Sequence, residues 1–115
     1  MDALSELEVW KRSKDLSVMI YTVLSKCKDY GFKDQITRSS VSVPANIAEG
    51  YERQSKKGFA HYLKIAKGSC AELRTQIIIG SDIGYIEKAD AKKLIDESLQ
   101  ISKMLSGLIK HCQKI

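Results

Sequence analysis

Arg38-Ser-Ser-Val-Ser-Val-Pro-Ala-Asn-Ile-Ala-Glu-Gly-Tyr-Glu-Arg53 is the segment from which we infer the architecture of the chain. Ile36, Ser40, Val43 and Ile47 recur through it at steps of four, three and four residues. This is the spacing of side chains that share one buried face of a helix. The segment therefore predicts a helix with one buried side.

Pro44 falls in the middle of this helix. A proline there removes one amide donor and crowds a carbonyl one turn earlier, at a cost of roughly 3 kcal/mol unless the helix bends. Because the apolar spacing continues undisturbed across it, we predict a bend at Pro44 and no break in the helix. We also expect a hydroxyl of Ser39, Ser40 or Ser42 to hydrogen-bond to the Ser40 carbonyl that the proline leaves free.

Polar residues lie close to the proline as well. Small side chains around Pro44 let another helix approach closely, so Asn46 and Glu49 are expected at a helix contact. Because buried polar groups must be paired, we interpret Asn46, Glu49, Arg38 and Glu72 as a structural polar network, with Glu72 paired to Arg38. The alternative is that Asn46 and Glu49 form a functional site.

Similar apolar spacings predict three more helices, each of the four being longer than twenty residues. Capping residues set their expected ends: Ser5 with Glu8 and Gly31 for a helix over about 6–29, Asp34 for the helix over about 34–53, Ser55 and Gly84 for the third, and Asp90 for the fourth, which runs to the end of the chain. Short connections make neighbouring helices antiparallel. The sequence thus predicts an all-α, antiparallel up-down-up-down four-helix bundle, with residues 1–115 as a single domain.

Three motifs carry a family resemblance: Val41-Ser-Val-Pro-Ala-Asn-Ile-Ala-Glu-Gly50, Tyr62-Leu-Lys-Ile-Ala-Lys-Gly-Ser-Cys-Ala-Glu-Leu73 and Gly84-Tyr-Ile86. Over nearly its whole length the chain resembles the four-helix bundle proteins encoded in intervening sequences of bacterial 23S ribosomal RNA genes. That family is similar in turn to the accessory protein of diversity-generating retroelements, a pentameric bundle that binds nucleic acid and a reverse transcriptase. The resemblance implies a bundle fold and a homopentamer, and it leaves the biochemical role open.

The composition is that of a basic protein without a membrane segment. The 115 residues carry a formal net charge of +5, spread along the chain with no basic tail, which is compatible with an acidic partner such as RNA. The longest apolar run, Ile77-Ile-Ile79, is too short to cross a bilayer, and the first residues lack the basic start of a secretory signal. We expect a cytoplasmic protein.

Basic residues gather on the third helix, opposite its apolar face. The stripe and its extension toward the preceding turn consist of Arg53, Lys56, Lys57, His61, Lys64, Lys67 and Arg74. On a helix with about 100° per residue the stripe spans an arc of about 140°, and it contains no acidic residue. We predict that it binds RNA or DNA backbone. The alternative is a solvated helix face.

The sequence predicts no catalytic or metal-binding arrangement. A di-iron bundle needs a glutamate three residues before each of two histidines, but those positions hold Gly58 and Leu108. Cys27, Cys70 and Cys112 lack metal-type spacing and are interpreted as reduced core residues. We therefore expect no enzyme, no metal and no cofactor.

Few aromatic residues are suited to stacking on nucleobases. We interpret Tyr21, Tyr51, Tyr62 and Tyr85 as core or interface residues.

Two functions are compatible with these features. The first is a non-enzymatic oligomer whose basic stripes bind nucleic-acid backbone without reading its sequence. The second is a structural or protein-binding oligomer with no nucleic-acid role. Six large apolar residues lie off the predicted buried faces: Trp10, Val18, Tyr21, Val41, Ile65 and Ile79. A monomer would expose some of them, which favours a homo-oligomer.

Overall fold

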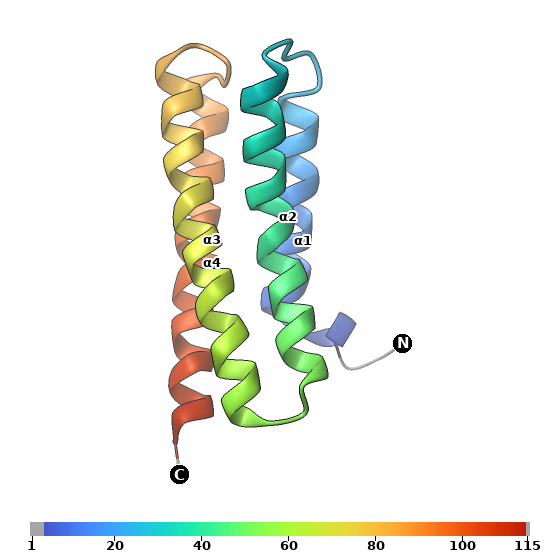
Figure 1. Cartoon of the computed structure of the whole chain (residues 1–115). Helices are drawn as coiled ribbons and strands as arrows, with labels where there is room; N and C mark the ends of the chain where they lie inside the picture. The colour runs from blue at the N-terminus through green and yellow to red at the C-terminus, as the bar shows by residue number, and fades with distance from the viewer. Residues whose placement is uncertain (1–3, 115) are drawn as a thin grey trace.

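The computed structural model describes residues 4–114 and confirms the four-helix bundle. A short 3-10 helix, η1 (Leu4–Glu6), precedes α1 (Glu8–Val23), α2 (Tyr30–Glu52), α3 (Lys56–Asp82) and α4 (Lys88–Gln113). The helices alternate in direction, as Figure 1 shows, and the molecule measures 47 × 23 × 22 Å. The α2–α3 turn lies at one end of the bundle, and the α1–α2 and α3–α4 loops lie at the other.

The predicted apolar faces form the core. Fully buried side chains come from every helix, and they include Leu16, Ile20, Ile36, Ile47, Leu63, Leu73, Ile77, Leu94, Ile101 and Leu105. The α4 face shifts near its end, where Ile109 is buried and Leu108 and Cys112 are only half-buried. The hydrophobic periodicity thus determines which face of each helix is turned toward the core.

Pro44 lies inside α2 without interrupting it, as predicted. The expected rescue of the Ser40 carbonyl by a serine hydroxyl is wrong for the described hydrogen bonds. Ser39 donates to the Gln35 carbonyl at 3.1 Å, Ser40 donates to the Thr37 carbonyl at 2.8 Å, and Ser42 shares a hydrogen bond with a serine of α3. The small hydroxyl side chains therefore serve the α1–α2 and α2–α3 contacts more than the proline.

The connection between α1 and α2 differs from the prediction. α1 is only 16 residues long and ends at Val23, so residues 24–29 form a loop. The Oδ1 atom of Asp29 accepts a hydrogen bond from the backbone amide of Phe32 at 3.1 Å, which begins α2 five residues before Asp34. Gly31 consequently lies in the first turn of α2 and does not end α1.

The other helix ends divide between confirmed and corrected predictions. Ser55 caps α3 by accepting from the Gly58 amide at 3.0 Å, and Gly84 follows the helix with φ +88°. The N-cap residues of α1 and α4 are Leu7 and Glu87, and neither makes a side-chain capping bond. The predicted helix starts at Ser5 and at Asp90 are therefore wrong, and Asp90 lies in the first turn of α4.

None of the helices among residues 4–114 combines the length and apolarity needed to span a bilayer. The three cysteines carry free thiols. Cys70 is buried in the core as predicted, whereas Cys27 lies in the α1–α2 loop and is only half-buried, so its placement on a helix face is wrong.

Candidate nucleic-acid interface

A basic trough runs between the first half of α3 and the end of α4. Its lower hollow, of about 600 Å³, is lined by Lys56, Lys57, Ala60, His61, Lys64, Cys112, Gln113 and Lys114. The adjoining hollow, of about 430 Å³, is lined by Lys64, Lys67, Gly68, Ala71 and Ile109. The two hollows share Lys64, and we refer to them together as the basic trough.

The charges of the basic trough are not balanced locally. No aspartate or glutamate lines either hollow. Among residues 4–114, no ion pair involves any of the five lysines of the basic trough, which are Lys56, Lys57, Lys64, Lys67 and Lys114. All five lysines are exposed, so their ammonium groups are free to meet an anion from solvent. Such a concentration of one sign of charge in a concave surface attracts a polyanion.

The lining of the basic trough includes three small residues of α3. Ala60 and Ala71 are alanines, and a Cβ atom built on Gly68 would meet no other atom within 4 Å. Such short side chains leave room for a strand of phosphates to approach the surface of α3. This shape suits contact with a backbone more than recognition of base edges.

Five of the seven predicted binding residues line the basic trough, and two do not. Arg53 donates to Glu49 and to the Tyr62 hydroxyl, each at 2.7 Å, and its guanidinium lies 4.9 Å from the centre of the Tyr62 ring. Arg74 is half-buried, and its Nη1 atom is buried without a hydrogen-bond partner among the described residues. The structure therefore places Arg53 on the α2–α3 side and turns Arg74 inward.

Cys70 and Cys112 differ in accessibility. Burial raises the pKa of the Cys70 thiol, although the nearby Arg74 opposes the shift, and the thiol donates to the Ser98 carbonyl at 3.2 Å. Cys112 is half-buried: it packs against the edge of the core, in partial agreement with its interpretation as a core residue, and it also lines the basic trough. A protonated, enclosed Cys70 is not a nucleophile.

The predicted polar network is divided. Glu72 accepts a hydrogen bond from Ser39 at 2.6 Å, whereas Arg38 pairs with Asp34 on its own helix at 3.0 Å. The expected pair of Arg38 with Glu72 is therefore wrong. An arginine four residues after an aspartate reaches it along one helix face without crossing to another helix.

The other two members of the network also lie apart. Asn46 donates to the carbonyl and to the hydroxyl of Ser42, and Ser42 in turn meets Ser69 of α3 at 2.8 Å. Glu49 pairs with Arg53. Asn46 thus supports the α2–α3 contact through Ser42, while Glu49 holds the arginine that covers Tyr62.

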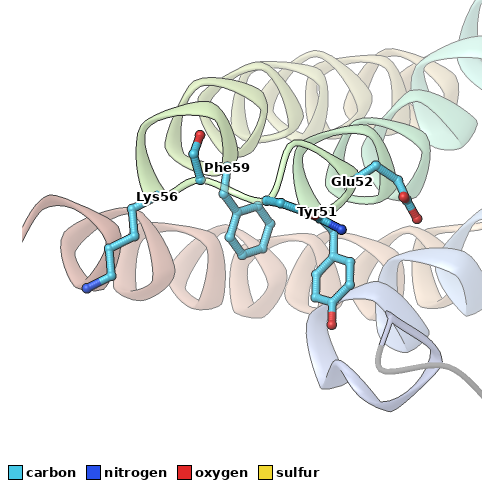
Figure 2. Close-up of a pocket in the computed structure, with 6 residues that line it drawn as sticks. Tyr51, Glu52, Lys56 and Phe59 are labelled. Atoms are coloured by element: carbon cyan, nitrogen blue, oxygen red, sulfur yellow. The ribbon is translucent and has the colours of Figure 1, made fainter.

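Two parts of this surface are not evident from the helix 3 stripe alone. Gln113 and Lys114 reach the basic trough from the end of α4, which the antiparallel topology places beside the start of α3. A further hollow lies at the α2–α3 turn and is lined by Tyr51, Glu52, Gln54, Ser55, Lys56 and Phe59. Figure 2 shows Tyr51 and Phe59 projecting to the same side of this turn.

Comparisons with known proteins agree with the fold. The family model described as 23S rRNA-intervening sequence protein matches residues 5–107. A crystal structure of a protein of unknown function from the S23 ribosomal protein family of Bacteroides thetaiotaomicron is 29% identical, with a TM-score of 0.82. The match covers 89% of this chain and 98% of that one. No curated protein matches the chain by sequence.

Proposed function

Since this chain belongs to the family of 23S rRNA-intervening sequence proteins, we propose that it is a non-enzymatic, homo-oligomeric bundle that binds the backbone of RNA or DNA. The observation that supports the proposal is the basic trough, which is lined by His61 and by five lysines that form no ion pair within residues 4–114, and by no aspartate or glutamate. Phosphates are the matching charges, and their contacts carry no sequence information. Binding is therefore expected to be strong at low salt and insensitive to sequence.

The test is the salt dependence of binding to a generic RNA. Each phosphate contact releases bound counterions, so the slope of log K against log salt counts the contacts. We predict that replacing Lys57, Lys64 and Lys67 together by alanine weakens binding and makes that slope shallower by roughly 2 to 3 units. The fold should persist, because the three side chains are exposed.

A matched control removes the same charge elsewhere. Lys26 and Lys28 in the α1–α2 loop and Lys88 at the start of α4 are also exposed and lie at the opposite end of the bundle. Their triple alanine variant should keep nearly the parental slope. If the two triple variants lose affinity and slope equally, the protein responds to net charge alone and the basic trough is not the site.

A second function is favoured by a different observation. Val18, Tyr21 and Val41 on α1 and α2 are 56%, 50% and 44% exposed. An apolar surface of this kind indicates a protein contact. If no RNA or DNA binds even at low salt, the chain is a structural or protein-binding oligomer in which these residues carry the interaction.

A further inference from the structure

The hollow at the α2–α3 turn combines aromatic and polar groups. It has a volume of about 490 Å³ and is lined by Tyr51 and Phe59 together with Glu52, Gln54, Ser55 and Lys56. We call it the aromatic hollow. It lies at the end of the bundle that also holds the lower part of the basic trough.

The two rings form a defined apolar wall. Tyr51 and Phe59 meet edge to face, with centroids 6.0 Å apart and planes at 87°. Both residues are only half-buried, so part of their ring surface faces the hollow (Figure 2). An exposed ring surface beside polar groups is the kind of platform on which a nucleobase stacks.

The turn that carries these rings is fixed by local contacts. Gln54 has φ 55°, a left-handed conformation that few residues other than glycine adopt. The Ser55 hydroxyl accepts a hydrogen bond from the Gly58 amide. Gly58 also packs closely against Arg53, because a Cβ on Gly58 would lie 2.7 Å from the Cβ of Arg53. The hollow is therefore preformed, and a ligand does not have to order it.

Lys56 connects the two surfaces, because it lines both the aromatic hollow and the basic trough. We propose that the aromatic hollow takes an unpaired base of a single-stranded RNA or DNA while the phosphates of the same strand lie in the basic trough. The inference rests on the proposed backbone binding and names its substrate class. A strand fits better than a duplex, because duplex bases are already stacked and offer no free face to the rings.

The test uses a single-stranded RNA with one fluorescent 2-aminopurine, and a fully paired duplex of the same length. The parental protein should bind the single strand more tightly and should change the emission of 2-aminopurine on binding. Tyr51→Leu with Phe59→Leu keeps apolar bulk and removes the rings. Loss of a stack worth about 1 to 3 kcal/mol lowers single-strand affinity at least about fivefold. Duplex affinity and its salt slope should stay unchanged.

Two further variants keep the test decisive. Tyr51→Phe retains the ring and should bind the strand like the parent, while Tyr51→Leu alone gives a fallback if the double variant does not fold. Tyr30→Leu is the matched control, because Tyr30 is 71% exposed at the opposite end of the bundle. It should leave both affinities unchanged.

The outcomes separate this inference from the backbone proposal. Salt-dependent binding of single strand and duplex with equal affinity, and no loss in Tyr51→Leu, would overturn the inference and leave the basic trough standing. A mononucleotide that bound as tightly as the strand would also overturn it. Absence of all salt-dependent binding would remove the backbone proposal and this inference together.

Discussion

Asp29 joins the two loops at one end of the bundle through a single carboxylate. Its Oδ1 atom accepts a hydrogen bond from the Phe32 amide at 3.1 Å, and its Oδ2 atom accepts one from the Tyr85 hydroxyl at 2.8 Å. The Tyr85 ring packs edge to face against Phe32, with centroids 5.3 Å apart. One residue thus begins α2 and ties the α1–α2 loop to the α3–α4 loop.

This arrangement predicts a sensitivity to acid. The amide of Phe32 first, and the Tyr85 hydroxyl second, lower the pKa of Asp29 below its ordinary value of 3.8. A depressed pKa stabilises the fold above the ordinary value, and the stabilisation is lost as the pH falls through the folded value. The urea midpoint should therefore fall less from about pH 5 to about pH 3 in Asp29→Asn than in the parent.

Asparagine is the informative replacement because it keeps an oxygen acceptor for the helix cap but does not titrate. An equal fall of the midpoint in parent and variant would show that other carboxylates govern unfolding in acid.

At the scale of elements, α2 and α3 approach each other closely at Gly50. A Cβ atom there would lie 2.7 Å from the Cβ of Tyr62 and 3.2 Å from the backbone oxygen of Phe59. Backbone atoms cannot move aside as a flexible side chain can. Gly50 is therefore required by the helix contact and not by its own backbone conformation.

Two glycine replacements should change stability in opposite directions. In a helix interior, alanine is favoured over glycine by about 1 kcal/mol, whereas overpacking costs about 1 to 3 kcal/mol. Gly107 lies inside α4 with no atom within 4 Å of its would-be Cβ. We predict that Gly50→Ala lowers the free energy of unfolding and Gly107→Ala raises it, as urea titrations would measure. A Gly50→Ala variant as stable as Gly107→Ala would contradict the close contact.

The helix faces could be predicted from the sequence, but several helix ends could not. Steps of three and four residues place Ile36, Ile47 and Leu63 in the core, and this prediction does not depend on the conformation of the loops. The sequence predicts that α2 starts at Asp34, whereas the helix starts after Asp29, and Asp29 is also bonded by Tyr85, a residue 56 positions away. Local spacing carries no information about such a contact.

The candidate site could likewise be predicted only in part from the sequence. Lys57, Lys64 and Lys67 could be placed because they lie opposite the apolar face of α3. Arg74 has nearly the same position on the helix, but its guanidinium turns toward Cys70, which periodicity cannot show. The sequence predicts Tyr51 to be a core or interface residue. That it lines a hollow depends on the geometry of the α2–α3 turn, which the sequence does not show.

At the scale of the whole molecule, α1 and α2 share an apolar surface. Ser17 and Ser40 hydrogen-bond to each other between the helices at 3.0 Å, and Val18 and Val41 follow them directly in the sequence. Both valines are exposed, as is Tyr21 one turn further along α1. In a ring, such a surface would contact a different surface of the next subunit.

We predict a homo-oligomer, and a pentamer in particular, by light scattering after gel filtration. The parental mass should be five times the 12.9 kDa of one chain. Val18→Asp with Val41→Asp should shift it toward one chain without loss of helix, whereas Leu99→Asp on α4, at a residue 42% exposed, should not. A parental mass of one chain across the micromolar range would rule out the oligomer, while a dimer or tetramer would rule out only the pentamer.

The contact that closes the bundle has a consequence for the order in which the protein is assembled. Arg12 of α1 donates to Glu97 of α4 across 85 positions of sequence, whereas α2 and α3 meet through a turn of a few residues. Contacts between distant positions form more slowly than local ones, because a longer loop must be closed first. The α2–α3 hairpin can therefore form while translation continues. α1 is made before α4, so it must wait for α4 before the core of the bundle is complete.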